Sequence, residues 1–271
     1  MTLHHILTAL ETLVPRDLQE TWDNAGLQCG DPRLEVSRVL TCLDVTEAIV
    51  LQAQSLGCQL IVAHHPLLFR GTKSIDPTRD CVSRCLLLAI QHGIAIYAAH
   101  TNLDRAPGGM NDTLALTLGL TQVTPLSDCG CWGHLPQPMT PRQLLHHISH
   151  HLGDIPLTVN RDALQADPRS AGDPADRLLH TLALCTGSGG EFIPEAEQLG
   201  LDAYLTGEIR YHDYIGHPDL LLIQAGHYQT EQHAATLLRD LLLRVCPGLQ
   251  CYPSDQPDPC AIYLPPSLSE V

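Results

Sequence analysis

Short apolar runs alternate with longer amphipathic segments along most of this chain. We predict strands at the apolar runs, because a short, continuous run of this kind is typical of a buried strand. These runs span 38–44, 58–63, 94–99, 179–185, 202–206 and 219–225. Helices are predicted at 2–13, 46–57, 79–92, 109–119, 140–152, 191–199, 208–216 and 228–244. The alternation indicates an α/β fold with mostly parallel strand pairing.

Two segments interrupt this rhythm. Residues 124–178 are rich in Pro, Asp and Gly, for example at Asp167-Pro168 and Gly172-Asp173-Pro174. We interpret this stretch as a loop-rich part of a second domain. Residues 253–266 carry five prolines, so an extended tail is expected there rather than a helix.

A histidine pair ends the second predicted strand. The run 60–63 leads directly into His64, His65 and Pro66. Proline stops the strand and biases His65 away from the helical region, which places both imidazoles at the carboxyl edge of a sheet. Ligand sites of α/β proteins lie at that edge. Taken alone, however, such a pair is more often structural or solvated than metal-binding.

Two more predicted strands end in a similar way. Each is followed by a histidine, three further residues and a carboxylate: His100 and Asp104 after 94–99, and His227 and Glu231 after 219–225. On a helix, His227 and Glu231 lie about one turn apart on the same face and can meet at a shared metal. Core packing does not explain why three strands end in histidine or carboxylate side chains, because a buried unpaired charge is costly. A bound cation commonly compensates such charges.

Length and composition indicate a globular protein. The chain has 271 residues, which suits one large or two small domains, and 44% of them are hydrophobic. No apolar run approaches the roughly 18 residues of a membrane span. The first residues lack the basic and long apolar regions of a secretory signal, so we expect a cytoplasmic protein without membrane contact.

The formal net charge of −15 bears on partners. An acidic surface repels the phosphates of nucleic acids and anionic lipids, so nucleic-acid binding is disfavoured. Segments typical of a P-loop, a dinucleotide-binding glycine fingerprint or a Gly-x-Ser-x-Gly elbow are absent from the sequence, which disfavours those enzyme classes.

The cysteines and one histidine cluster suggest no separate site. The chain has 11 cysteines, an odd number, and no Cys-x-x-Cys pair, so we expect reduced cysteines in a protein too large to need disulfides. Cys129-Gly130-Cys131 is more readily structural than redox-active or metal-binding. Four histidines on the predicted helix 140–152 are interpreted as a solvated face, because no carboxylate or cysteine stands among them at ligand spacing: His146, His147, His150 and His151.

Several short motifs together resemble one known family. In chain order they are Trp22-Asp23-Asn24-Ala25-Gly26-Leu27, Leu43-Asp44-Val45-Thr46, His64-His65-Pro66-Leu67 with Phe69, His100-Thr101-Asn102-Leu103-Asp104, Gly109-Met110-Asn111-Asp112, Gly187-Ser188-Gly189-Gly190, Thr206-Gly207-Glu208 with Tyr211-His212, and Gly226-His227-Tyr228 with Glu231. The chain resembles the NIF-three-like family of dinuclear-metal proteins, also called GTP cyclohydrolase I type 2 homologues. One departure is Trp132 and His134, in a stretch that is small and glycine-rich in the family.

The resemblance implies two α/β domains, with mixed and mostly parallel sheets, and a metal site in the cleft between them. We place the first domain at 1–124 plus 226–271 and the second at 125–225. The resemblance also implies homo-oligomers, commonly rings of six. Residues that match the family's metal ligands are His64, His65, Asp104, His227 and Glu231, with Glu231 as the bridge. Cleft positions without an assured ligand role are His100, Glu208 and His212.

These residues favour a metal-dependent hydrolase. Mixed nitrogen and oxygen ligands suit two ions of Zn, Fe, Mn, Co or Ni better than Mg or Ca. Two such ions, about 3.5–4 Å apart, lower the pKa of a shared water toward neutrality. They would also attract a small anionic substrate, which we expect to be a nucleotide or related phosphate compound. Glu208 or His212 is the candidate general acid or base. The alternative is a non-catalytic metal-binding or regulatory scaffold, or a ring that stores or delivers metal.

Overall fold

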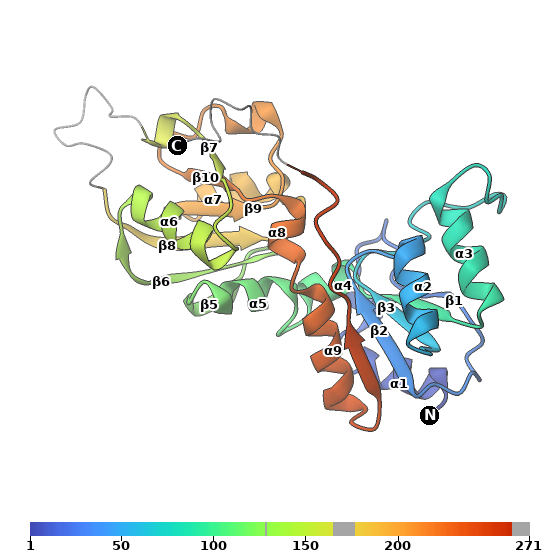
Figure 1. The fold of residues 1–271 in the computed structure, drawn as a ribbon. Coiled ribbons are helices and arrows are strands. Elements are labelled where there is room, and N and C mark those ends of the chain that lie inside the picture. Colours follow the sequence, from blue (N-terminus) through green and yellow to red (C-terminus); the bar gives the residue numbers. More distant parts are fainter. Residues whose placement is uncertain (128, 165–176, 262–271) are drawn as a thin grey trace.

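Two mixed β-sheets form the cores of two lobes (Figure 1). The computed structural model describes residues 1–127, 129–164 and 177–261. Asp167-Pro168, Gly172-Asp173-Pro174 and residues 262–266 of the expected tail therefore lie outside the described residues. The prediction of an α/β fold with two mixed sheets is confirmed.

The first sheet has the strand order β1-β4-β3-β2-β11. Its strands are β1 (Gly26–Cys29), β2 (Arg38–Cys42), β3 (Leu60–Ala63), β4 (Ala95–Ala98) and β11 (Gln250–Pro253). β4, β3, β2 and β11 run parallel, and β1 pairs antiparallel with β4. The three predicted strands of this region are confirmed at β2, β3 and β4, whereas the edge strands β1 and β11 were not predicted.

Helices cover both faces of the first sheet. One face packs against α1 (Leu3–Glu11) and α9 (Ala234–Val245), and the other against α2 (Glu47–Ser55) and α3 (Cys81–Gln91). Successive residues of β3 point to opposite faces, so Leu60 and Val62 enter the first core and Ile61 and Ala63 the second. A strand buried on both sides must be apolar at every position, which is why these strands appear as continuous apolar runs.

The second sheet has the order β5-β6-β8-β9-β10-β7. Its strands are β5 (Thr121–Pro125), β6 (Cys131–Met139), β7 (Thr158–Val159), β8 (Leu179–Cys185), β9 (Ala203–Thr206) and β10 (Leu221–Gln224). β8, β9 and β10 run parallel, as predicted, and the outer pairings are antiparallel. One face packs against α5 (Met110–Thr117) and α6 (Pro141–His151), and the other against α7 (Ile193–Gln198).

The expectation that 124–178 is loop-rich is wrong for β6. Cys131, Gly133 and Leu135 are buried along this strand, whereas Trp132 is half-buried and His134 is exposed. This alternation is typical of an antiparallel strand with one solvated face, and it produces no continuous apolar run.

Two predicted helices differ from the structure. Only a 3₁₀ turn at Tyr211–Tyr214 forms within 208–216, where Tyr211 and Ile215 are exposed and so give no buried stripe. The segment 228–244 forms two helices, α8 (His227–Glu231) and α9, because the chain turns at 232–233. The other predicted helices are observed within their expected ranges, and the short α4 (Thr101–Arg105) was not predicted.

The carboxyl edges of the two parallel strand sets meet between the lobes. Cys42, Ala63 and Ala98 are aligned by the register of β2, β3 and β4, so their following loops leave the sheet together. The ends of β8, β9 and β10 are aligned in the same way, and α8 lies where the lobes meet (Figure 1). Among the described helices, none is long and apolar enough to cross a membrane.

Candidate metal centre

The Glu231 carboxylate lies among three imidazole rings. Its Oε2 atom is 3.0 Å from the Nε2 atoms of both His65 and His227, and its Oε1 atom is 3.7 Å from Nε2 of His64. Oδ1 of Asp104 is 3.6 Å from the same His64 nitrogen. All five residues that match the family's ligands are thus brought together by the loops and short helices that follow strands of both sheets.

Each of the three rings is oriented through its Nδ1 atom. His64 Nδ1 lies 2.8 Å from the Ala99 carbonyl oxygen, His65 Nδ1 lies 2.8 Å from Asp44, and His227 Nδ1 lies 2.9 Å from Glu208. A carbonyl can only accept, so His64 carries its proton on Nδ1, and the Nε2 of the neutral ring offers a lone pair. Histidines that bind metals are oriented by such outer partners.

Two buried atoms of this cluster lack a hydrogen-bond partner among the described residues. They are Nε2 of His64, whose side chain is fully buried, and Oε2 of Glu231, to which the Nε2 atoms of His65 and His227 lie close but are not aligned for a hydrogen bond. Leaving such atoms unsatisfied is costly. A cation would satisfy both, and the neutral nitrogen and anionic oxygen donors suit a transition-metal ion. The residues present therefore fit a metal centre.

The buried charges shift one another's protonation. Burial raises the pKa of Asp104. Burial also acts to raise the pKa of Glu231, but three imidazoles outweigh it and hold that pKa well below its usual range: those of His227, His64 and His65. Burial opposes the charge on His65, but Asp44 and Glu231 raise its pKa to about 10. Glu231 and Glu208 raise the pKa of His227 to about 9 against the effect of burial. The metal-free cluster therefore holds protons where a cation would bind.

His100 lies beside these ligands. Its ring centroid is 5.2 Å from that of His64 and 5.5 Å from that of His65, and its Nδ1 is 2.8 Å from Asp23. Asp23 also accepts bonds from the Thr101 backbone and hydroxyl. Burial raises the pKa of Asp23, but the contacts with His100 and Thr101 together lower it to about 2. In the described residues, two groups have possible metal-ligand atoms that all lie within 4.8 Å of one another. The first group is His64, His65 and His100, and the second is His65, His227 and Glu231.

Asn111 connects the two lobes next to Asp104. Its Nδ2 donates to the Asp104 carbonyl at 2.9 Å, and its Oδ1 accepts from the Thr186 backbone nitrogen at 2.8 Å. The roles of Asn111, Asp44 and Asp23 were not predicted from the sequence. The available signal was their place inside the family motifs, because the partners His65, His100 and Thr186 lie 21, 77 and 75 residues away along the chain.

The sequence matches the Duf34/NIF3 (NGG1p interacting factor 3) family over residues 1–259. The chain belongs to this family. It is similar to the "GTP cyclohydrolase 1 type 2 homolog" of Clostridium perfringens, with 32% identity covering 85% of this chain and 87% of the relative. The protein of the same name from Streptomyces coelicolor is 36% identical, covering 84% and 81%. The sequence-based resemblance is thus confirmed.

A solved structure shows the same fold. The Bacillus cereus protein related to NIF3 superposes with a TM-score of 0.86 over 97% of this chain and 99% of its own, at 23% identity. A likeness at that identity concerns the fold alone, so the evidence for the metal centre is the geometry of this chain's own residues.

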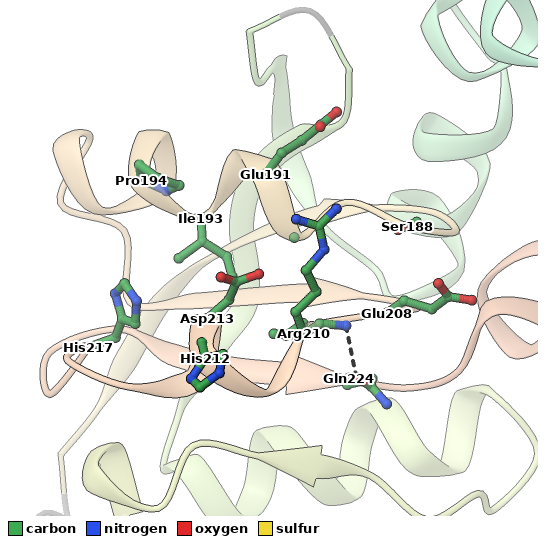
Figure 2. A pocket seen from close by; sticks show the side chains of 12 residues that line it. Ser188, Glu191, Ile193, Pro194, Glu208, Arg210, His212, Asp213, His217 and Gln224 are labelled. Carbon is green, nitrogen blue, oxygen red and sulfur yellow. Dashed lines mark hydrogen bonds between the residues drawn. The ribbon is translucent and has the colours of Figure 1, made fainter. Parts of the chain in front are cut away.

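A cavity of about 400 Å³ opens onto the candidate metal centre of this family member. Its walls come from both lobes, and its lining residues include Trp22, Phe69, His100, Ser188, Glu191 and Phe192. A second cavity, of about 750 Å³, shares Ser188 and Glu191 with the first and extends along the second lobe (Figure 2).

The two predicted acid–base residues lie in different places. Both line the second cavity and neither is among the residues that line the first, but Glu208 also contacts the candidate ligand His227. Figure 2 shows them at separate ends of the second cavity, with Arg210 between them. The structure therefore brings Glu208, but not His212, next to the candidate ligands.

The features expected to be structural form no second metal group in the described chain. His146, His150 and His151 are exposed on α6, and His147 bonds to the Leu118 carbonyl. All cysteines are free thiols, as expected. Trp132 and His134, which depart from the family's usual residues, line neither cavity.

Proposed function

We propose that this protein is a dinuclear divalent-metal hydrolase that acts on a nucleotide or a related phosphate compound. The observation that carries the proposal is the buried Glu231 carboxylate, which contacts three imidazole nitrogens and opens onto a 400 Å³ cavity. A cavity of that volume accepts a small molecule. The name of the curated relatives supports a hydrolytic reaction.

The chain would hold two ions through His64, His65, Asp104, His227 and Glu231, and we propose Glu231 as the carboxylate that bridges them. Bound ions supply a Lewis acid and lower the pKa of a coordinated water. Glu208 keeps the His227 ring oriented, and its half-exposed carboxylate can accept a proton in the cleft. His212 can act only on a part of the substrate that extends into the second cavity.

The test combines metal content with turnover. Protein reconstituted with Zn, Mn or Fe should contain close to two ions per chain by elemental analysis, and it should hydrolyse at least one member of a nucleotide panel. Glu231→Gln keeps the size but removes the central charge, so it should lose at least one ion and all turnover. A metal content near zero after reconstitution, or full activity in Glu231→Gln, would contradict the proposal.

A matched control lies on the same helix. Gln229 points away from the centre, because its Nε2 donates to Asp258. Gln229→Ala should therefore keep both ions and full activity. If both variants bind two ions equally well, Glu231 is not the bridge, and Glu208 becomes the first acid to test in its place.

One observation favours the alternative function. The side chains of His64 and Glu231 are 0% and 4% exposed, and a centre so deeply enclosed also suits metal storage or a regulatory scaffold. Full metal loading without turnover of any nucleotide would favour this second function.

We also propose that the protein forms a homo-oligomer, most simply a hexamer, because the family resemblance implies one. Light scattering on metal-loaded protein should report a mass near six times the 29.6 kDa of one chain. A monomer at working concentrations would contradict this proposal and leave the metal centre unaffected.

A further inference from the structure

Aromatic side chains gather at the mouth of the metal cavity. The whole chain has two tryptophans and two phenylalanines, and three of these four line that cavity: Trp22, Phe69 and Phe192. Trp22 is 58% exposed and Phe69 is 47% exposed, so neither side chain fills a core. Tryptophan and phenylalanine are scarce in this protein, and three of the four are placed where a ligand would enter.

The positions of Trp22 and Phe69 are fixed by their loops. Asn24 Nδ2 donates to the Leu68 carbonyl at 2.7 Å, and the Leu68 nitrogen donates to Gln28 Oε1 at 3.0 Å. The loop before β1 and the loop after β3 are thereby joined. As a result, the Trp22 and Phe69 ring centroids lie 5.9 Å apart with an interplanar angle of 74°.

The two rings also lie beside the metal centre. Trp22 and Phe69 are 6.2 Å and 6.1 Å from the His100 ring, which in turn neighbours the ligands His64 and His65. A small molecule held by the aromatic rings therefore has its other end within reach of the candidate ions. A free aromatic face binds any planar ring by stacking, without needing a particular pattern of hydrogen bonds.

We propose that Trp22 and Phe69 bind a planar heteroaromatic ring of the substrate, while an anionic phosphate arm of the same molecule reaches the metal centre. The position of the arm rests on the proposed function. The ring position rests on the exposure of the Trp22 and Phe69 side chains and on the cavity that they line. Trp22 and Phe69 thus determine specificity: they select compounds that carry a flat ring on the phosphate arm.

The test uses two probes that differ only by a ring, guanosine 5′-monophosphate and ribose 5-phosphate. Equilibrium dialysis against zinc-loaded protein should show the nucleotide binding about tenfold more tightly or better, because stacking of a base on an aromatic ring contributes about that factor. Trp22→Ala should remove most of this preference and leave the affinity for ribose 5-phosphate unchanged. Phe69→Ala should reduce the preference independently.

Tyr211→Ala is the matched control. This aromatic residue is 78% exposed but lines neither of the two cavities, so its removal should leave both affinities unchanged. Equal binding of the two probes to the unaltered protein would overturn the proposal, as would an equal loss of both affinities in Trp22→Ala.

Two further outcomes distinguish ring binding from a contact between copies and from hydrolysis. If Trp22→Ala lowers the molar mass in light scattering but keeps the ring preference, the aromatic residues belong to a contact between copies, and the proposal is overturned.

Because the readout is binding, it needs no turnover. An intact ring preference without hydrolysis of any nucleotide would support this proposal and contradict the hydrolase function, whereas hydrolysis without a ring preference would do the reverse.

Discussion

Asp44 is one of the two carboxylates that orient the imidazole rings of the candidate ligands, the other being Glu208. The Asp44 carboxylate is 2.8 Å from Nδ1 of His65, and it stands on the loop after β2 with 41% of its side chain exposed. Removing it should disturb the orientation and basicity of His65 with little effect on the core. Outer partners of this kind matter in metal sites because they fix both the tautomer and the direction of the ligand.

We therefore expect Asp44→Ala to weaken zinc binding by about 10- to 100-fold, the usual effect of losing such a partner. Competition with a chromogenic chelator measures this change. Asp31→Ala is the control, because Asp31 pairs with Arg33 at the surface and should leave the affinity unchanged. Equal affinities in the two variants would show that His65 needs no orienting partner.

Protonation of the ligands should make metal binding depend on pH. In the metal-free protein the pKa values of His65 and His227 are raised to about 10 and 9, so at neutral pH both rings carry a second proton and a positive charge. A metal binds the neutral ring, and binding must release these protons. The apparent affinity should therefore rise with pH from neutrality toward these pKa values. Calorimetric titrations in buffers of different ionisation enthalpy measure the released protons, and a pH-independent affinity would contradict the expectation.

At the scale of elements, glycine at two strand ends lets the loops approach the centre. Gly187 follows β8, and its nitrogen donates to the Thr230 hydroxyl on α8 at 3.1 Å. Its backbone adopts a φ of +63°, and an added Cβ would overlap Oε1 of Glu231. A Cβ added at Gly207, which follows β9, would likewise overlap the Gly187 carbonyl oxygen. Only glycine allows this packing beneath the carboxylate.

Gly187→Ala should therefore displace Glu231 and lose metal. Gly200→Ala is a matched control, because Gly200 has a similar φ of +66° but no atom within 4 Å of the added Cβ. Each substitution should cost about 1 kcal/mol of unfolding free energy from the left-handed backbone alone. Only Gly187→Ala should reduce the zinc content in elemental analysis. Equal zinc contents would show that the close approach at Gly187 is not needed.

The strand ends that carry the histidines were predictable because parallel strands place their following loops at one edge of a sheet. The orienting groups were not predictable. The contacts of His65 with Asp44 and of Thr186 with Asn111 form only when segments that are separate along the chain pack together. β6 lacked a continuous apolar run, and the apparent helix at 208–216 had no buried stripe to stabilise it. Both errors arose because solvent exposure of one face is invisible in a simple count of apolar residues.

At the scale of the whole molecule, the candidate ligands come from both lobes. His64 and His65 follow β3 of the first sheet, whereas His227 and Glu231 follow β10 of the second. Separate apolar cores lie on the faces of each sheet, so the burial of hydrophobic residues stabilises each lobe largely on its own. A bound ion would add a connection between the lobes that the cores do not provide.

Metal binding should for this reason raise the thermal stability of the folded chain. An ion that binds only the folded state adds about 2.7 kcal/mol when its free concentration is a hundred times Kd, and chelation should remove that contribution. Calorimetric scans should show a higher Tm with zinc than with chelator in the unaltered protein and in Gln229→Ala. Glu231→Gln should show a smaller difference, because it should lose at least one ion together with the charge that joins the two sets of ligands. A zinc-dependent Tm of equal size in Glu231→Gln would mean that the stabilising ion binds elsewhere, since the loops of the two lobes meet at the Glu231 carboxylate.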